Sequence, residues 1–579
     1  MYTWSLEKLY QDFDATFEKD LKTLDSKLDD LAVITKNLKG KEDLEDWIRF
    51  NQELQGLVRN LGGFTSLRMS TNVNDQEAQK YYGQLMNIFS KSAGPAAAFS
   101  KWIYSVKDEF KDWVNESDLI KEHEFILQED IHNAKYTLDE AVEVAISRMQ
   151  INASNNWTQL QSHLTSNTTI EFRGETHTMT SLRNLAYDKD PEVRKDAYKK
   201  ELELYKTMED SIAYSLNSIK GQVIHTNDMR GYDSPLSETL DQSRLSKASL
   251  DALVQAIENN LPNFRRYYKH KAKLFGHEAG LPWYDLFATH DVKNAKDYTI
   301  EDSQALILEN FRSFSDDLAD MAQSAFDDAW IDYLPKEGKR GGAFCSNLPQ
   351  IKESRVMLNF GGSISDVVTM AHELGHAYHG LMIQDNSMLN TGYSMPVAET
   401  ASTFCENIVF NASLKNASDD EKIMLIENTL QDVTQITVDI LSRYKFESEV
   451  FERRQSEFLD SKALQDIMIQ AQKDSYGDGL STYHPYMWAC KGHYYSAGRN
   501  FYNFPYAFGG LFALGLYSQY QQEGASFVDK YRTLLKKTPI ASCEDVAKVA
   551  DVDITDVAFW ESSIGLINDM IDQYIALTS

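Results

Sequence analysis

Basic side chains are scarce in this 579-residue chain. Its 58 lysines and arginines face 87 aspartates and glutamates, which gives a formal net charge of −29 at pH 7. Such a charge repels nucleic acid and anionic membrane surfaces, so we expect neither as a partner. Long apolar runs are missing as well, because no stretch approaches the roughly 18 apolar residues that a membrane-spanning helix needs.

Cysteine and proline are also rare. The four cysteines stand far apart without CxxC spacing, which indicates neither a disulfide framework nor a cysteine zinc knot. The chain begins Met-Tyr-Thr-Trp-Ser-Leu-Glu, which has neither the basic nor the apolar segment of a signal peptide. These features predict a cytoplasmic protein. Eleven prolines are too few for a set of modules on hinged linkers, so one large body is expected.

Helical periodicity is what the chain has in abundance. Apolar residues recur at steps of three and four from Phe13 to Leu31, which is typical of an amphipathic helix. A second such helix is expected over 43–61, where Gly62-Gly63 would stop it. Further helical stretches are expected over 74–93, 137–163, 191–221, 246–275, 301–329, 419–475 and 527–579.

Strand-like segments are few. Residues 168–179 predict a hairpin that turns at Gly174. We place a boundary there, between an N-terminal helical region (1–180) and the remainder (181–579). Gly341–Cys345 and Val356–Phe360 are short, apolar and bounded by turn residues, so they predict a small β-sheet. The expected fold class is mainly α.

The most informative stretch is 363–380, which contains the HEXXH pattern at residues 372–376. Ser363 followed by Asp366 predicts a capped helix. In that helix His372 and His376 project from one face, one turn apart. They can hold two corners of a zinc tetrahedron, and a third protein ligand leaves one corner for water. Glu373, on the flank of this face, is placed to act on that water as a general base.

The third metal ligand is expected in the helical pattern of 396–406. Glu399 and Glu406 share a face there, and the apolar neighbours indicate a packed helix. Glu399 would complete a site of two histidines and one glutamate, and Glu406 would orient a ligand histidine from behind. His379 is a rival ligand. It would crowd the same helical face, so a supporting or substrate-facing role suits it better.

A run of aromatic residues, 483–506, follows later in the chain. Peptide hydrolysis by a metal-activated water forms an oxyanion, and fixed donors such as tyrosine hydroxyls or an imidazole stabilise it. The candidates are His493, Tyr502 and Tyr506. The competing interpretation is an aromatic core segment whose hydroxyls are satisfied internally.

The ordered motifs resemble the oligoendopeptidase F family, which is similar to thimet oligopeptidase and neurolysin. The resemblance spans nearly the whole chain and is carried by Trp4–Tyr10, Arg230–Tyr232, Gly338–Cys345, Met357–Phe360, Ala371–His379, Glu399–Ser402 and His493–Tyr506.

The resemblance implies a two-lobed helical fold around a deep channel, one zinc ion per chain and cleavage of internal bonds in short peptides. His372, His376 and Glu399 would be the ligands and Glu373 the base, and the short strands would pair with the substrate backbone. His493 and Tyr506, then Tyr502, match the oxyanion donors. Two alternatives remain: a metallocarboxypeptidase of related fold, and a non-catalytic peptide-binding protein.

Overall fold

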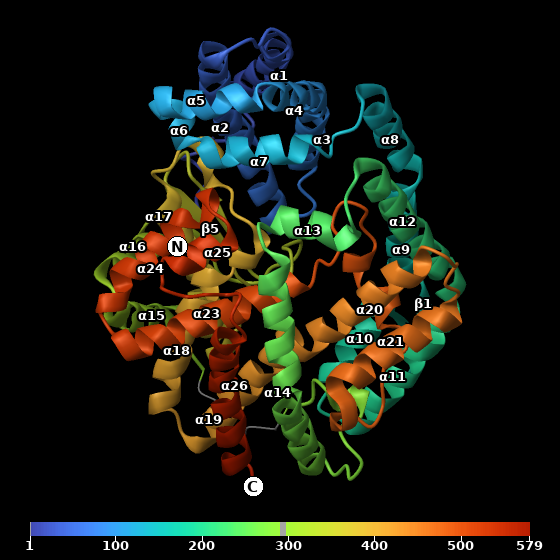
Figure 1. Ribbon diagram of the computed structural model, residues 1–579. Coiled ribbons are helices and arrows are strands. Elements are labelled where there is room, and N and C mark those ends of the chain that lie inside the picture. Colours follow the sequence, from blue (N-terminus) through green and yellow to red (C-terminus); the bar gives the residue numbers. More distant parts are fainter. Residues whose placement is uncertain (1, 290–296) are drawn as a thin grey trace.

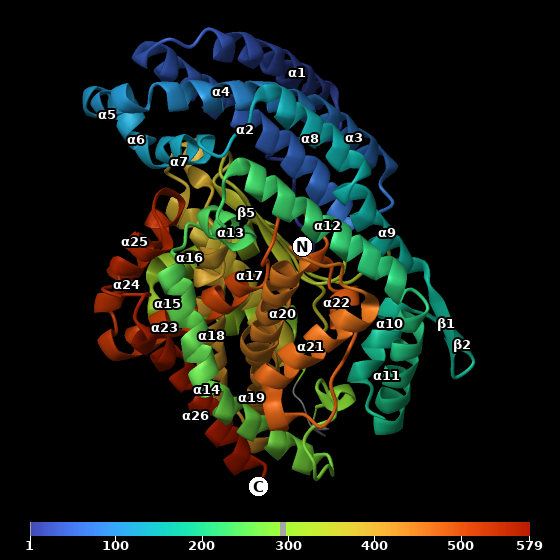
Figure 2. The same ribbon diagram turned by 45° about the vertical axis from the view of Figure 1, so that its right-hand side comes forward.

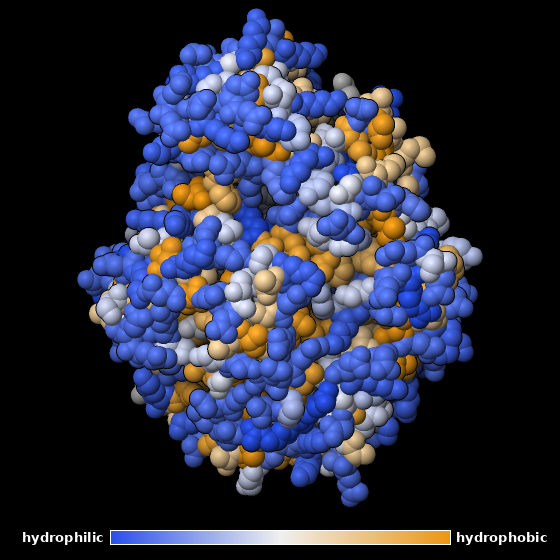
Figure 3. Space-filling view, in the orientation of Figure 1, coloured by the Kyte–Doolittle hydropathy of each residue, from blue (hydrophilic) through white to orange (hydrophobic). Residues whose placement is uncertain are grey.

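The computed structural model describes residues 2–289 and 297–579, and helices dominate it (Figure 1). Two small sheets, of two and three strands, are present among these residues. The predicted mainly α fold is therefore confirmed. No helix in the described ranges is both long and apolar enough to cross a membrane. The surface in Figure 3 is mostly hydrophilic, with apolar areas near the middle of that face and at its upper right.

Seven helices form an N-terminal layer that lies over the rest of the molecule, at the top of Figures 1 and 2. Its apolar side chains make two small cores of their own, one centred on Phe17, Leu61 and Phe64 and the other on Ile48 and Ile103. The helices are α1 (Ala15–Lys36), α2 (Lys41–Thr71), α3 (Gln76–Phe89), α4 (Ala93–Ser105), α5 (Lys107–Glu116), α6 (Asp118–Glu122) and α7 (Glu124–Ala134).

The predicted stop of the second helix at Gly62-Gly63 is wrong, because α2 continues to Thr71. The two glycines permit close packing instead. A Cβ at Gly63 would lie 3.2 Å from Leu348 Cδ2, and one at Gly62 would lie 3.7 Å from Leu85 Cδ2. A glycine pair inside a helix can therefore mark a contact with a neighbouring element rather than an end.

The next segment forms one side of the body, on the right in Figure 1. The hairpin is confirmed: β1 (Thr169–Phe172) and β2 (Glu175–Thr178) pair antiparallel, and Gly174 takes φ +88° in the turn. Two expected single helices are each divided, at Ala153 and at 207–208. The helices are α8 (Glu140–Asn152), α9 (Ser154–Asn167), α10 (Met179–Asn184), α11 (Pro191–Lys206), α12 (Glu209–Arg230) and α13 (Pro235–Ser243).

The remaining helices complete the body. The main hydrophobic core starts at Phe172 and continues to Tyr574. The helices are α14 (Lys247–Leu274), α15 (Ile300–Phe314), α16 (Asp316–Asp327), α17 (Ile364–Ile383), α18 (Thr400–Asn416), α19 (Asp419–Thr434), α20 (Ile440–Arg454), α21 (Ser461–Tyr476), α22 (Met487–Cys490), α23 (Phe504–Glu523), α24 (Ser526–Lys537), α25 (Cys543–Lys548) and α26 (Val557–Leu577). The boundary near residue 180 stays a prediction.

A three-stranded sheet packs beside α17. Its order is β3 (Ile331–Asp332), β5 (Glu353–Met357) and β4 (Phe344–Leu348), so β4 is an edge strand. The expected sheet is present, but β4 starts later and β5 starts earlier than the apolar pattern predicts. Ser354 and Arg355 are buried in β5, and Arg355 donates hydrogen bonds to the carbonyls of Ser5 and Ser354. Because this start of the strand is polar, the spacing of apolar residues does not reveal it.

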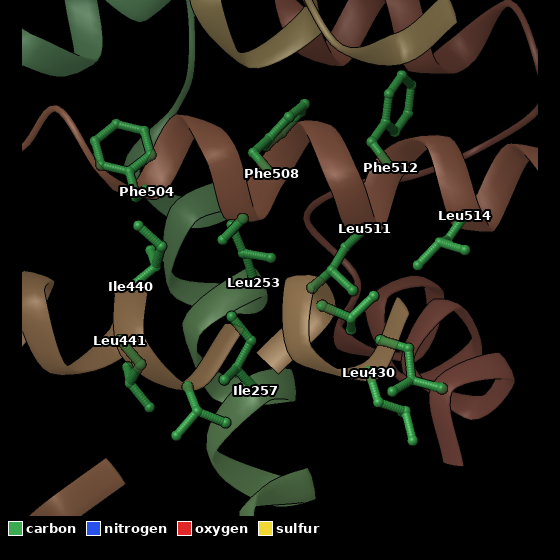
Figure 4. Packing of buried hydrophobic residues seen from close by; sticks show 14 of the residues in the cluster. Leu253, Ile257, Leu430, Ile440, Leu441, Phe504, Phe508, Leu511, Phe512 and Leu514 are labelled. Atoms are coloured by element: carbon green, nitrogen blue, oxygen red, sulfur yellow. The ribbon is translucent and has the colours of Figure 1, made fainter. Parts of the chain in front are cut away.

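Helix α23 lies in the centre of the main core. In Figure 4, Leu511 and Leu514 point to the side on which the labelled residues of α14, α19 and α20 lie, and Phe508 and Phe512 point to the opposite side. The apolar residues of α23 include Phe504, Phe508, Leu511, Phe512 and Leu514, all of which are almost completely buried. A helix that is apolar all round is held by its neighbours on every face. It therefore gives a rigid support to any polar side chain that it carries near its start.

A buried ion pair joins α12 to α20. Lys220 Nζ donates to Glu447 Oε1 at 2.7 Å and to Asn500 Oδ1 at 3.0 Å, and both charged side chains are 1% exposed. Asn503 Nδ2 donates to Glu447 Oε2 at 3.3 Å. The pair thereby ties residues 500–503, the loop that leads into α23, to two helices of the body.

We predict that Glu447→Leu lowers the free energy of unfolding by about 3–5 kcal/mol, because it leaves the Lys220 ammonium buried without a counter-charge. Denaturant unfolding measures this loss. The double variant Lys220→Met/Glu447→Leu should recover most of it, since no charge is then stranded. Lys462→Met, which opens the exposed pair with Asp466, serves as the control and should change stability by less than about 1 kcal/mol. Equal losses of stability in Glu447→Leu and Lys462→Met would contradict the importance assigned to the buried pair.

Candidate active site

The HEXXH residues lie on α17, as predicted. The Ser363 hydroxyl accepts a hydrogen bond from the Asp366 amide at 3.2 Å, and Asp366 Oδ2 accepts one from the Ser363 amide at 2.9 Å. This capping box starts the helix, and the residues that bury it include Val367, Met370 and Leu374. His372 and His376 consequently point from one face of a helix whose start and burial are both fixed by the local sequence.

Glu399 lies at the point where its chain segment enters α18. It occupies the N-cap position rather than the helix interior that the sequence pattern predicts. Its Oε2 lies 3.3 Å from His372 Nε2 and 3.4 Å from His376 Nε2. One ligand atom from each of the three residues falls within 4.8 Å of the others. The structure therefore brings together the three residues that the sequence proposes as metal ligands.

The two helices approach very closely at Gly375. A Cβ at this position would lie 2.5 Å from the Ala401 carbonyl oxygen and 2.6 Å from Ser402 Cα. Any larger residue would have to push α18 away. Because Glu399 immediately precedes α18, this contact sets the distance between the carboxylate and both histidines.

The donor set fits a zinc ion. Burial lowers the pKa of His376 to about 4, so its imidazole is neutral and has a lone pair to offer. Burial also lowers the pKa of His372, but its hydrogen bonds to Glu399 and Glu406 outweigh burial and raise that pKa well above the usual range. The carboxylates of Glu399 and Glu406 favour the protonated form of His372. A bound dication would balance the same negative charge. Two imidazoles and one carboxylate are a ligand set typical of zinc hydrolases.

Two neighbours orient the proposed ligands. Glu406 Oε2 lies 3.1 Å from His372 Nδ1 and accepts its hydrogen bond, which leaves Nε2 directed at Glu399. The Ser402 hydroxyl donates to Glu399 Oε2 at 2.7 Å. The position of Glu406 agrees with the orienting role expected for it. Ser402 was not singled out from the sequence, because a serine one turn into a helix has no distinctive pattern.

Glu373 is buried beside the histidines, and its Oε2 has no hydrogen-bond partner among the residues that the structure describes. Burial raises its pKa to about 7, although the neighbouring charge of His372 opposes this shift. A carboxylate that is buried without a hydrogen-bond partner costs free energy, unless another group occupies the space in front of it. Such a group, poised near neutral pH, is suited to accept and return a proton.

His379 lies outside the His–His–Glu group. Its Nε2 is 2.7 Å from Thr538 Oγ1, and its ring stacks on Tyr393 with centroids 4.2 Å apart. The Thr538 hydroxyl donates to the Leu535 carbonyl, so it accepts the proton of His379. Burial lowers the pKa of His379 to about 3. These contacts favour a supporting role over a ligand role.

The aromatic segment brings its three candidate residues together. The rings of His493, Tyr502 and Tyr506 lie with centroids 5.4–6.0 Å apart. Burial, followed by the neighbouring Tyr502, raises the pKa of Tyr506 to about 12, so its hydroxyl keeps its proton and can donate. Burial and the nearby Arg443 lower the pKa of His493, and its Nδ1 is buried without a hydrogen-bond partner in the described ranges.

A cavity of about 560 Å³ joins these elements. His372, Glu373, Glu399 and Tyr506 all line it, together with apolar side chains of α18, α19 and α23. Asp432 of α19 also lines the cavity, and burial raises its pKa to about 6. The sequence did not single out Asp432, because one aspartate in an amphipathic helix carries no pattern. Tyr506, which is far from the motif in the sequence, therefore lines the same cavity as the motif residues.

A mainly helical body in which two histidines and a carboxylate converge beside a buried glutamate, at the wall of a cavity, is typical of a metal-dependent peptidase. The chain belongs to peptidase family M3, whose family model matches residues 184–566. Peptidases of this family are generally zinc-dependent. The family resemblance and the predicted class, a metalloendopeptidase, are thereby confirmed.

The chain is similar to named relatives over almost its full length. It is 23% identical over 585 residues to the oligopeptidase PepF of Bacillus subtilis, a match that covers 99% of this chain and 86% of the relative. A crystallised protein of Chlamydophila abortus has the same fold, with a TM-score of 0.85, 18% identity and coverage of 99% and 98%. The oligoendopeptidase F of Enterococcus faecium gives a TM-score of 0.71, 18% identity and coverage of 97% and 99%.

We expect Gly375→Ala to impair metal retention, because the added methyl pushes α18 and therefore Glu399 away from the two histidines. Zinc content after dialysis should fall below one per chain, and stability should drop by about 1–3 kcal/mol. Gly565→Ala is the matched control, since a Cβ at Gly565 of α26 meets nothing within 4 Å. It should leave zinc content unchanged. Full zinc retention in Gly375→Ala would refute the proposed importance of the close contact.

Proposed function

We propose that this chain is a zinc-dependent endopeptidase that hydrolyses internal bonds of short, unstructured peptides. The observation that carries the proposal is the convergence of His372, His376 and Glu399 beside the buried carboxylate of Glu373. These three residues would hold one zinc ion per chain. A reducing, cytoplasmic location is part of the proposal, and the absence of disulfides among the four cysteines supports it.

Zinc in this position would supply a Lewis acid that lowers the pKa of water and polarises the scissile carbonyl. Glu373 takes up the proton of the attacking water at its free Oε2 as the new C–O bond forms. It then delivers that proton to the nitrogen of the leaving amine as the C–N bond breaks. The same carboxylate serves both steps because its pKa lies near neutrality.

The aromatic residues stabilise the negative charge that develops on the carbonyl oxygen. Tyr506 lines the cavity with Glu399, and its high pKa keeps the hydroxyl protonated as a donor. The ring centroids of His493 and Tyr502 lie 6.0 and 5.8 Å from that of Tyr506, close enough for both residues to orient it. We assign the principal donor role to Tyr506 because it alone of the three lines the cavity of the motif helix.

The peptide backbone binds along the edge strand. Only one side of β4 pairs within the sheet, and Ala343, immediately before it, lines the catalytic cavity. A peptide added as a further strand would present its backbone to this edge and its scissile bond to Glu373. An extended chain meets this requirement and a compact protein does not, which favours short unstructured substrates. The names of the relatives, oligopeptidase and oligoendopeptidase, agree with this choice.

Glu373→Gln should retain zinc but lose at least about a hundredfold in turnover, because the amide cannot accept the proton of water. Zinc content and cleavage of an end-blocked fluorogenic peptide are measured on the same preparation. Chelation should abolish the wild-type activity, and added zinc should restore it. A variant that cleaves at the wild-type rate would remove Glu373 from the mechanism.

For Tyr506→Phe we predict a kcat lowered by about ten- to a thousandfold with a much smaller change in KM, since one donor to the developing charge is lost. Steady-state kinetics on the same peptide test this. Tyr520→Phe removes a hydroxyl from the far part of the same helix and should leave both constants unchanged. If Tyr506→Phe is normal and Tyr502→Phe is slow, the donor is Tyr502 instead.

A further inference from the structure

One cationic side chain next to the site forms no ion pair with any residue that the structure describes. Lys491 is partly buried between α22 and the turn that carries His493, and no carboxylate among the described residues lies within ion-pair distance of its ammonium group. Burial, and then the nearby Arg443, lower the pKa of Lys491. Asp439 acts in the opposite direction, but its carboxylate is already paired with Arg443. A partly desolvated cation beside other cations would be stabilised by an anion of its own.

The neighbouring arginines already form ion pairs, so their charges are compensated. Arg443 forms an ion pair with Asp439, and Arg183 Nε lies 3.2 Å from Glu201 Oε1. Arg194, further along the same cavity wall, pairs with Asp285 at 2.8 Å. The charge of Lys491 is therefore the one that remains uncompensated among the cations of this cluster.

Lys491 faces a cavity that adjoins the catalytic one. The second cavity measures about 460 Å³, and Lys491, Arg183 and Tyr198 are among its lining residues. Asp432 and Gln435 line both cavities, so the two meet at α19. Lys491 is also close enough to His493 to depress the pKa of that imidazole. A peptide that extends beyond the catalytic cavity at this end would enter the second one past Asp432 and Gln435.

We propose that Lys491 is a specificity residue that binds a carboxylate of the peptide substrate in this second cavity. The carboxylate comes either from the peptide's C-terminus or from an aspartate or glutamate side chain. This inference rests on the proposed peptidase function. It adds to that function a preference for acidic groups at a fixed distance from the scissile bond.

Two carboxylates on the cavity wall could oppose an anionic ligand. Glu201 is compensated by Arg183 and lies 3.2 Å from His484 Nε2. Asp432 lies on the side of the metal residues, where Glu406 and His372 influence its pKa. The groups that influence the pKa of Lys491 most, besides burial, are Arg443, Cys490, Asp439 and Arg183. The end of the cavity at Lys491 therefore keeps its positive character.

The test uses internally quenched peptides with one cleavable bond. In one arm, peptides of increasing length end in a free carboxylate or in an amide. In the other arm, a glutamate or a glutamine is moved through the positions on both sides of the cleaved bond. For wild-type enzyme we expect kcat/KM to favour the acidic member of a pair by about ten- to a hundredfold at one position or length. The arm that shows the preference identifies the source of the carboxylate.

Lys491→Met should reduce that preference to about twofold or less, mainly through a higher KM for the acidic peptides. Lys491→Arg keeps the charge and should retain most of the preference. Lys473→Met on α21 is the control lysine and should change nothing. Melting temperatures show whether each variant is folded, and the wild-type comparison of acidic with neutral peptides remains decisive if Lys491→Met does not fold.

The possible outcomes separate this inference from the proposed function. A wild-type enzyme that cleaves no peptide contradicts the peptidase assignment itself. A wild-type enzyme that cleaves peptides but treats acidic and neutral members alike refutes the role of Lys491 alone. A preference that is present in the wild-type enzyme but persists in Lys491→Met also refutes that role.

Discussion

The close contact between α17 and α18 is the constraint on which the site depends. The motif helix can supply two imidazoles by itself, but the third proposed ligand comes from a different segment. Gly375 lets the backbone of Ala401 approach to a distance that no side chain would allow. Glu399 reaches both histidines because of that approach, and Glu406, two turns along α18, meets His372 from the other side. One glycine thus determines the geometry of two carboxylates.

A second set of contacts positions the aromatic residues of the site. These residues lie more than a hundred positions after the motif helix α17 in the chain. Helix α23 is packed on all sides (Figure 4), and the loop before it is tied to the buried Lys220–Glu447 pair through Asn500 and Asn503. Phe501 in this loop takes φ +50°, an unusual conformation for a residue with a side chain. The body thus holds Tyr502 and Tyr506 in place without help from substrate. A fixed donor of this kind costs no reorganisation during the reaction.

The sequence predicts the elements whose signal is local. The capping box and apolar spacing of α17, the hairpin at Gly174 and the helix start at residue 191 are all found as expected. Prediction from the sequence fails where tertiary contacts determine the local structure. Gly62 and Gly63 continue a helix because neighbours pack against them, and the polar start of β5 is buried by contacts that no periodicity reveals. For the site, residue types and spacing single out Glu399 and Glu406. The uncompensated charge of Lys491 becomes visible only when the ion pairs of its neighbours are known.

The most direct test of the proposed metal site is a crystal structure of the zinc-loaded protein with data collected at the zinc absorption edge. We expect one anomalous peak per chain, about 2.0–2.2 Å from Nε2 of His372, Nε2 of His376 and a carboxylate oxygen of Glu399. Glu373 would lie beside the metal without binding it. A fully occupied zinc held by other residues, or one that His379 rather than Glu399 coordinates, would contradict the proposed site.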